Sequence, residues 1–200
     1  MQHKRATTQA QIHDLIASRW SPRAFAADKA VSHPDLTACL EAARWAPSCF
    51  NDQPWRFVVC DKSSNLAAWE TALSVIVEKN QLWAKNAPVF ILTVAMQNFN
   101  HNGKANRFAA YDTGAATLSL CLQANALGLI THQMGGFDAD KARQVLKLPD
   151  DCTPMAMLAL GYQAEANNLA EEFQAGEQAE RSRAALEQRF YLGQWGEAFK

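Results

Sequence analysis

The sequence lacks the features that mark membrane proteins and nucleic-acid-binding proteins. Its 200 residues carry a net charge of −1, which gives no electrostatic footprint for nucleic acid or an anionic membrane. The longest apolar run, residues 88–96, is far shorter than the roughly 20 residues that a membrane-spanning helix needs. Residues 1–8 are polar and do not resemble a signal peptide. These absences predict a soluble, cytoplasmic protein.

Cysteine is present, but in a pattern that argues against a disulfide framework. The five cysteines are odd in number, widely spaced and mostly set in apolar runs, which favours reduced core thiols and no metal site. A nucleophilic role for Cys49 is disfavoured, because no histidine or basic residue neighbours it in the sequence. The sequence also lacks a Gly-x-Gly-x-x-Gly motif, a Walker loop and a zincin motif. A nicotinamide cofactor would therefore not be held by a Rossmann fingerprint.

The remaining pattern is that of one globular domain, residues 1–200, with 48% hydrophobic and 20% charged residues. Apolar residues alternate between helical spacing and short continuous runs, which predicts an α/β or α+β sandwich around one sheet. Ser32, Ser63 or Ser64, and Asp138 are expected N-caps, and Gly128 an expected C-cap. We expect helices ending near 18 and over 32–46, 63–77, 108–127 and 138–148, with strands over 55–60, 88–96, 129–134 and 153–160.

The C-terminal part changes character. Residues 163–185 are dominated by Ala, Glu, Gln and Asn, and several large apolar side chains then follow close together. Such a tail cannot build a core of its own, so its aromatic side chains must dock elsewhere. These side chains are Leu186, Phe190, Tyr191, Trp195 and Phe199.

Three segments carry candidate ligand-binding chemistry. Residues 19–23 (Arg-Trp-Ser-Pro-Arg) place two guanidiniums and a hydroxyl just past a predicted helix, which suits a phosphorylated cofactor or, more simply, a solvated helix end. Gly135 and Gly136 follow a predicted strand, where backbone N–H groups can approach a planar ligand; a turn with positive φ is the alternative. Residues 47–55 form a polar loop fixed by two prolines, either a ligand loop or a structured turn.

Taken together, these segments resemble the FMN-dependent nitroreductase family along almost the whole chain. No single motif is specific, but the set is. The motifs are Arg19-x-Ser21-x-Arg23-x-Phe25, Pro47-Ser48-x-x-Asn51-x-Gln53-Pro54-Trp55, Asn80-x-x-Trp83-Ala84-x-x-Ala87-Pro88, Asp112-x-Gly114-Ala115-Ala116, Gly128-Leu129 and His132 to Asp138.

The resemblance implies an α+β, three-layer α/β/α sandwich around a mixed, mainly antiparallel sheet. It also implies an obligate homodimer in which about residues 163–200 pack on the partner subunit. FMN would lie at the interface. Its phosphate would be held by Arg19 and Ser21 and its pyrimidine edge by Arg23, with the backbone near Gly135 facing N5. The full implied set for FMN is Arg19, Trp20, Ser21, Arg23, Pro47, Ser48, Cys49, Asn51, Asn80, Gln133, Met134, Gly135, Gly136, Arg181 and Arg183, with the loop residues 47–51 reaching the FMN of the other subunit.

The activity implied is transfer of a hydride from NAD(P)H to FMN and then to a nitroaromatic, a quinone or a similar flat acceptor, by a ping-pong mechanism. A flavin-dependent dehydrogenase for another small molecule and a non-catalytic flavin-binding protein are the alternatives. No side chain is assigned as a catalytic acid or base. The expected acceptor pocket includes Phe50, Phe108 and Tyr111, with Phe99, Asn100, His101 and Asn106 as further candidates for its rim.

Overall fold

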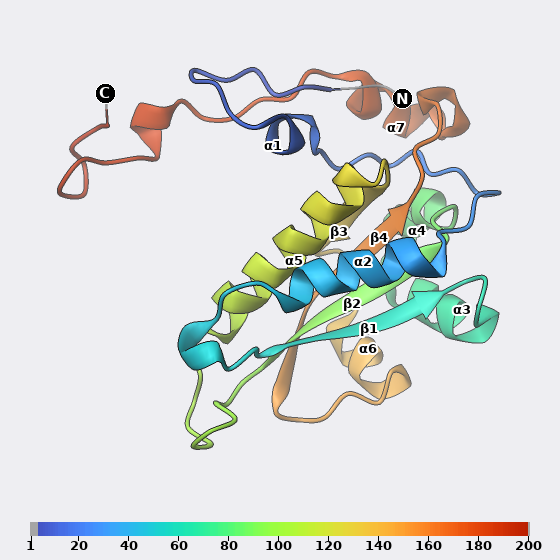
Figure 1. Ribbon diagram of the computed structural model, residues 1–200. Coiled ribbons are helices and arrows are strands. Elements are labelled where there is room, and N and C mark those ends of the chain that lie inside the picture. Colours follow the sequence, from blue (N-terminus) through green and yellow to red (C-terminus); the bar gives the residue numbers. More distant parts are fainter. Residues whose placement is uncertain (1–3, 200) are drawn as a thin grey trace.

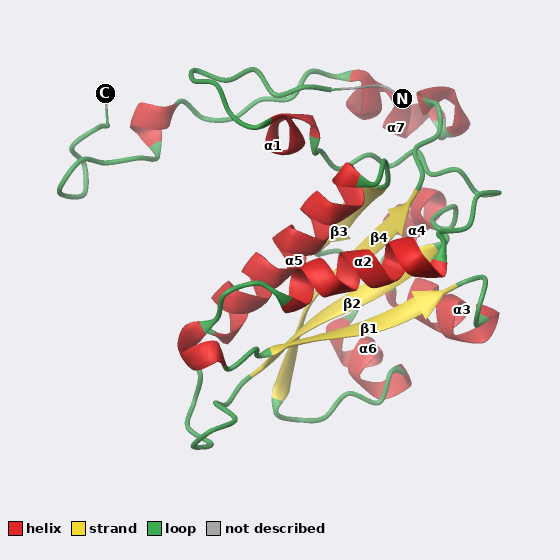
Figure 2. Ribbon diagram, viewed as in Figure 1, coloured by secondary structure: helices red, strands yellow, loops and turns green. Residues whose placement is uncertain are grey.

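A four-stranded sheet forms the centre of the computed structural model, which describes residues 4–199 (Figures 1 and 2). Its order is β1-β2-β4-β3, and all three pairings between neighbours are antiparallel. The resemblance implies a mixed, mainly antiparallel sheet. Within the described residues every pairing is antiparallel, so no parallel pair is present there. The strands are β1 (Trp55–Asp61), β2 (Val89–Met96), β3 (Ile130–Met134) and β4 (Cys152–Gly161).

One face of the sheet is covered by two long helices, α2 (His33–Arg44) and α5 (Ala109–Ala126), with the short α1 (Asp14–Ser18) beside α5 (Figure 2). Side chains alternate along β2, so Val89 and Ile91 pack on this face and Phe90 and Leu92 on the other. The second face packs on α3 (Leu66–Val75), α4 (Glu78–Ala84) and α6 (Ala139–Val145). The predicted three-layer α+β sandwich is confirmed.

The prediction of one helix over residues 63–77 is wrong at both ends. Asn65, not Ser63 or Ser64, is the N-cap, because its side chain accepts from the backbone N–H of Ala68 at 3.0 Å. The helix ends at Val75, since Ile76 is extended and pairs with Phe137. Val77, which lies in the predicted helix, is instead the exposed N-cap residue of the separate helix α4.

Other predicted helix ends are confirmed. The Ser32 hydroxyl and the Asp138 carboxylate each accept a backbone N–H bond at their helix N-termini, and Gly128 has a φ of +74° after α5. The helix predicted over 138–148 ends earlier, at Val145, and Lys147 adopts a left-handed φ of 54° just beyond it.

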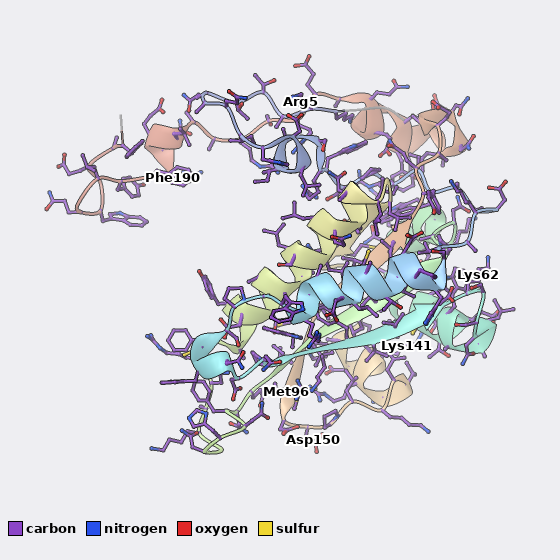
Figure 3. The ribbon with its side chains drawn as sticks, viewed as in Figure 1. Arg5, Lys62, Met96, Lys141, Asp150 and Phe190 are labelled. Carbon is purple, nitrogen blue, oxygen red and sulfur yellow. The ribbon has the colours of Figure 1, made fainter. Side chains whose placement is uncertain are left out.

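The C-terminal part first docks on its own chain and then leaves it. Residues 163–178 include α7 (Glu171–Gln178), and Leu169 and Phe173 enter the core beneath it. Residues 190–199 then form a small hairpin that projects from the body, with Phe190 on its near strand (Figures 1 and 3). Trp195 in this hairpin is 88% exposed. Three short 3-10 helices complete the chain: η1 (Cys49–Asn51), η2 (Ala166–Asn168) and η3 (Leu186–Gln188).

All five cysteines are free thiols, as predicted. Cys49 is half-buried and the other four are buried, and burial raises the pKa of Cys39 to about 12. No group of three or more His, Cys, Asp or Glu residues within 4–199 could hold a metal ion. Across the same residues, none of the helices combines the length and apolar character that crossing a bilayer requires.

Candidate functional site

Arg19 and two arginines of the C-terminal segment, Arg181 and Arg183, come together beside α1. Arg19 Nη1 lies 3.4 Å from the hydroxyl of Ser21. Arg181 donates to the backbone carbonyls of Lys4 (2.8 Å) and Ala17 (2.7 Å), which holds it beside the Arg19 loop. Burial, followed by the charges of Arg19 and Arg183, lowers the pKa of Arg181. We call Arg19, Arg181 and Arg183 the arginine cluster.

No carboxylate within residues 4–199 forms an ion pair with the arginine cluster. Guanidiniums that repel one another and have no protein counterion are arranged for an external anion, and their forked donors match phosphate oxygens. A cavity of about 90 Å³ adjoins the cluster and is lined by Arg19, Trp20, Cys121, Asn125 and Thr131, among others. The arginine cluster is thus a candidate anion site, with a cavity next to Arg19.

Arg23 lies beside α4 and α7, and a Cβ placed on Gly176 would be 3.9 Å from its Nη1. Its guanidinium carbon is 6.0 Å from the centroid of the Trp83 ring. The Trp83 ring also lies 6.2 Å from the ring of Phe25 and 4.6 Å from that of His132. Nδ1 of His132 lies 2.9 Å from the carbonyl oxygen of Pro22, so this nitrogen carries the proton and donates. Arg23, Phe25 and His132 therefore all pack against the Trp83 ring.

Burial lowers the pKa of His132 to about 4, and the charges of Arg23 and Arg19 act in the same direction. The unfolded chain binds a proton at an ordinary histidine pKa of about 6.5, whereas the folded chain does not. The free energy of unfolding is therefore expected to fall by up to about 3 kcal/mol as the pH drops from about 6.5 to 4. Urea unfolding across this range measures it. His132→Gln should show a smaller fall, and identical slopes for the two proteins would contradict this assignment.

The glycine pair follows β3 and meets α4. The N–H of Val77 donates to the carbonyl of Gly136 at 3.0 Å. A Cβ on Gly136 would lie 2.7 Å from Asn80 Nδ2, so close approach requires glycine here. Gly135 and Gly136 are not among the positive-φ glycines, so the alternative of a positive-φ turn does not hold. A Cβ on Gly135 would meet nothing within 4 Å, so its backbone borders open space.

Met134 and Gln133, which precede the glycine pair, fit the implied FMN site only in part. The Met134 side chain is 3% exposed and belongs to the core, which leaves only its backbone for a ligand. The Gln133 amide lies 3.6 Å from the sulfur of Cys121 and so points toward α5. Their predicted roles toward FMN stay predictions, as do those of all the other residues in the implied set.

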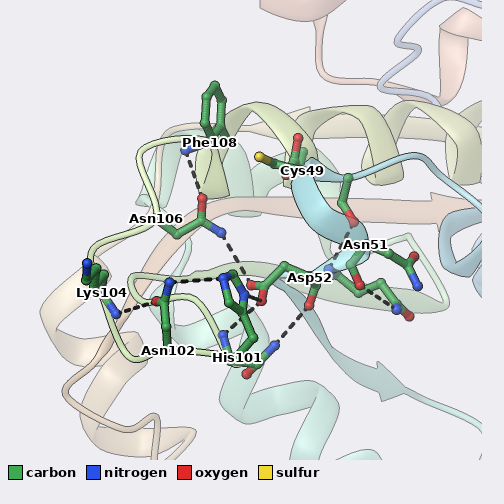
Figure 4. Close-up of polar contacts among 12 residues, drawn as sticks. Cys49, Asn51, Asp52, His101, Asn102, Lys104, Asn106 and Phe108 are labelled. Atoms are coloured by element: carbon green, nitrogen blue, oxygen red, sulfur yellow. Dashed lines mark hydrogen bonds and ion pairs between the residues drawn. The ribbon is translucent and has the colours of Figure 1, made fainter.

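The loop over residues 47–55 is strained and held by buried polar contacts (Figure 4). Phe50, Asn51 and Gln53 have left-handed φ values of 55°, 54° and 52°. The N–H of Cys49 donates to Asp112 at 3.0 Å, at the start of α5, which is the structural role expected of an aspartate there. Strain of this kind persists where the surroundings enforce it and tends to cluster at functional sites.

A pocket of about 510 Å³ lies beside this loop. Asp52 is buried and accepts from the N–H of Asn100 at 2.8 Å (Figure 4). The Phe50 ring packs edge-on against Phe99 and His101, at 5.9 and 5.4 Å. The pocket is lined by Phe50, Asn51, Asp52, Gln53, Asn100 and His101. Of the three expected acceptor residues, only Phe50 is in this lining; Phe108 and Tyr111 are not.

Helix α5 separates the two halves of the predicted site. Cys49 is bonded to Asp112 at its start, while Asn125 Nδ2 near its end donates to the carbonyl of Leu15 and the hydroxyl of Ser18, next to Arg19. Asp112 and Asn125 are 13 residues apart, which is about 20 Å along a helix. Figure 1 shows η1 and α1 at opposite ends of α5. Within one chain, the loop and the arginine cluster do not meet.

The sequence pattern did not indicate two buried carboxylates, Asp52 and Glu177. Asp52 fixes the loop over residues 97–107, and Glu177 accepts backbone N–H groups of Arg23 and Ala24. An aspartate among polar loop residues and a glutamate in an acidic tail both look solvent-exposed in sequence. No local signal distinguishes them.

The fold is that of an α+β protein, and the candidate anion site lies at one end of α5. A family model described as "Nitroreductase family" matches residues 16–162, and the chain belongs to that family.

Relatives agree with this assignment. A crystal structure of an oxidoreductase containing FMN is 32% identical, has a TM-score of 0.89 and aligns over 96% of each chain. An uncharacterized 15.4 kDa protein of Mycolicibacterium smegmatis is 32% identical over 63% of this chain and 84% of its own. An NADH dehydrogenase of Thermus thermophilus is 31% identical over 65% of this chain and 76% of its own.

Proposed function

We propose that this protein binds FMN and uses it to pass electrons from NAD(P)H to a nitroaromatic, a quinone or a similar flat acceptor. The observation that carries the proposal is the arginine cluster, whose guanidiniums have no carboxylate partner within residues 4–199. A mononucleotide phosphate is an anion that fits such a cluster. The cavity next to Arg19 is lined by the first residues of β3, and the open space at Gly135 follows the last one. The relatives named as an FMN-containing oxidoreductase and an NADH dehydrogenase support the same reading.

Each part of the site has a distinct task. Arg19, Ser21, Arg181 and Arg183 hold the phosphate, and Arg23 meets the pyrimidine edge of the ring. The backbone at Gly135 and Gly136, with Asn80 beside it, borders the reactive part of the ring without blocking its face. When bound, FMN supplies the hydride chemistry, and the protein supplies orientation and electrostatics. One open ring face, used first by nicotinamide and then by the acceptor, favours a ping-pong order.

A complete site requires a second copy of the chain. The strained loop and the arginine cluster lie about 20 Å apart along α5, so one bound FMN can contact both only if they come from different copies. In the proposed homodimer, Pro47, Ser48, Cys49 and Asn51 of one protomer reach the FMN held by the other. Exposed apolar side chains on and beside α5 are suited to the interface: Ile16, Trp45, Tyr111 and Leu118.

The pocket beside Phe50 is the proposed acceptor site, because it adjoins the loop that reaches FMN. Phe50→Ala removes the ring that a flat acceptor would stack on. We expect the KM for an aromatic acceptor to rise about five- to tenfold, since such contacts are worth roughly 1 kcal/mol. Steady-state assays with a nitroaromatic measure this, and Phe50→Leu, which keeps apolar bulk, is the control. Reduction of ferricyanide, which needs no stacking, should stay unchanged. Equal losses with both acceptors would contradict this placement.

The proposed function is tested by the cofactor and the stoichiometry of the purified protein. Light scattering on a column, with absorbance and mass spectrometry of the released cofactor, should show a dimer that carries one FMN per chain. A monomer that still holds FMN would contradict the shared site. Stopped-flow reoxidation with a panel of acceptors distinguishes the proposal from its alternatives. A flavin dehydrogenase would respond to another donor, and a non-catalytic flavin-binding protein would not turn over.

A further inference from the structure

A buried carboxylate lies next to the cationic segment of residues 19–23. Glu177 is 1% exposed and comes from α7, in the C-terminal part of the chain. Its two oxygens share the backbone N–H of Arg23, each at 3.0 Å, and Oε1 also accepts the N–H of Ala24 at 3.1 Å. The bonds thus run to the backbone of the loop that carries Arg19, Ser21 and Arg23.

Burying a charge is costly unless hydrogen bonds and opposite charges compensate. Here the compensation comes from two backbone N–H groups and from nearby cations. The charge of Glu177 raises the pKa of Lys4 against the larger, lowering effect of burial, and Lys4 Nζ donates to the carbonyl of Gly176 at 3.2 Å. No ion pair joins Glu177 to an arginine within the described chain. The guanidiniums of the site are therefore not neutralised by it.

The loop that Glu177 holds has little support of its own. Residues 19–24 form no helix or strand. Beyond Glu177, the loop is fixed by the bond from His132 Nδ1 to the carbonyl of Pro22 (2.9 Å) and by the bond from the N–H of Ala164 to the carbonyl of Ala24 (2.8 Å). The bridge between Phe25 and Gln163 follows directly after it. Helix α7 is anchored in turn by Phe173, which is 8% exposed in the core. The backbone N–H groups of Arg23 and Ala24 are thus bonded to α7 through the Glu177 side chain.

We propose that Glu177 is a positioning residue for the cofactor. It fixes the backbone at Arg23 so that the arginines of the loop face the FMN site, and it makes FMN affinity depend on the docking of α7. This inference rests on the proposed function, because it assumes that FMN is the ligand of this loop.

Glu177→Gln gives a test whose sign is diagnostic. The amide keeps the size of the side chain but loses the charge and one of the two acceptor oxygens. If Glu177 only added negative charge near a phosphate, the variant would bind FMN more tightly. If it positions the loop, FMN binding should weaken by about tenfold or more, as expected when a charge-assisted bond is lost. The reduction potential of bound FMN should also fall, because Arg23 is displaced.

Phe173→Leu is the matched control, since it loosens the same helix without touching Arg23. FMN affinity is measured by fluorescence titration of the apoprotein, the potential by dye titration, and stability by thermal melting. When the two variants are compared at an equal loss of melting temperature, Glu177→Gln is expected to bind FMN more weakly than Phe173→Leu. Only Glu177→Gln should shift the reduction potential of bound FMN. Unchanged or tighter binding in Glu177→Gln, or equal losses in both variants, would overturn it.

Failure of the wild-type protein to bind FMN and failure of Glu177→Gln to fold can both be distinguished from failure of this proposal. A wild-type protein that does not bind FMN would refute the proposed function itself, independently of Glu177. If Glu177→Gln does not fold, Glu177→Asp takes its place, since it keeps the charge but withdraws it by one methylene. Weaker FMN binding by Glu177→Asp than by Phe173→Leu supports the positioning role, and wild-type binding contradicts it.

Discussion

Arg19→Ala is expected to raise the dissociation constant of FMN roughly 10- to 150-fold and to leave the potential of any bound flavin nearly unchanged. Hydrogen bonds to charged groups are worth about 1.5–3 kcal/mol, which corresponds to this range. Arg19 lies with Arg181 and Arg183, so in the proposed site its loss acts on the phosphate end of the ligand. Fluorescence titration of the apoprotein with FMN measures the effect.

Arg23→Ala should show the complementary result. Two-electron reduction adds negative charge at the pyrimidine edge of flavin, and a cation at that edge stabilises the reduced form more than the oxidised form. Loss of about 1.5–3 kcal/mol of this preference lowers the potential by about 30–60 mV. Titration against reference dyes measures the shift, and FMN binding should also weaken. The potential alone thus separates the two arginines.

The control for both variants is Lys141→Ala. It removes one positive charge from α6, on the opposite face of the sheet from α1 and α5. It should change neither the affinity nor the potential. A shifted potential in Arg19→Ala with none in Arg23→Ala would show that the two assignments are wrong.

Removal of residues 186–200 is expected to convert the proposed dimer to a monomer and to weaken FMN binding by more than about 100-fold. In the projecting hairpin, Phe190, Leu192 and Trp195 are 55%, 68% and 88% exposed. Apolar surface of this kind marks an interaction site. When the dimer dissociates, all contacts between the second copy and FMN are lost at once. The free energies of these contacts add, which gives the large loss of affinity.

The truncation is designed to preserve the chain's own core. It keeps Arg181, Arg183 and the docked residues 163–178, so the melting temperature should fall little when both proteins are compared without FMN. Light scattering gives the oligomeric state. A truncated protein that is still a dimer with wild-type FMN affinity would show that the hairpin is not the arm of the dimer.

The strands were predictable from the sequence because their cause is local. Continuous or alternating apolar residues between turn residues gave all four strands to within a few residues of their observed bounds. The break at Ile76 and Val77 was not predictable. Their apolar spacing continues that of the helix, and only the distant partners Phe137 and Gly136 hold them extended.

The candidate site was predictable in its residue types but not in its arrangement. The guanidiniums near Arg19 and the glycine pair carry their chemistry in their sequence motifs. The bonds from Arg23 and Ala24 to Glu177 span more than 150 residues and depend on the docking of α7. The separation by α5 likewise depends on the tertiary structure, and it is the observation on which the proposed shared site rests.

The most direct test of the central claim is anaerobic rapid mixing of the FMN-loaded protein with NADH and, separately, with NADPH, followed through the flavin absorption band. We expect at least one nucleotide to bleach the flavin band in a single turnover, and a quinone or a nitroaromatic then to restore it. If neither nucleotide bleaches the band of a fully loaded dimer, the protein is not an NAD(P)H-dependent flavoenzyme, and the proposed function is wrong.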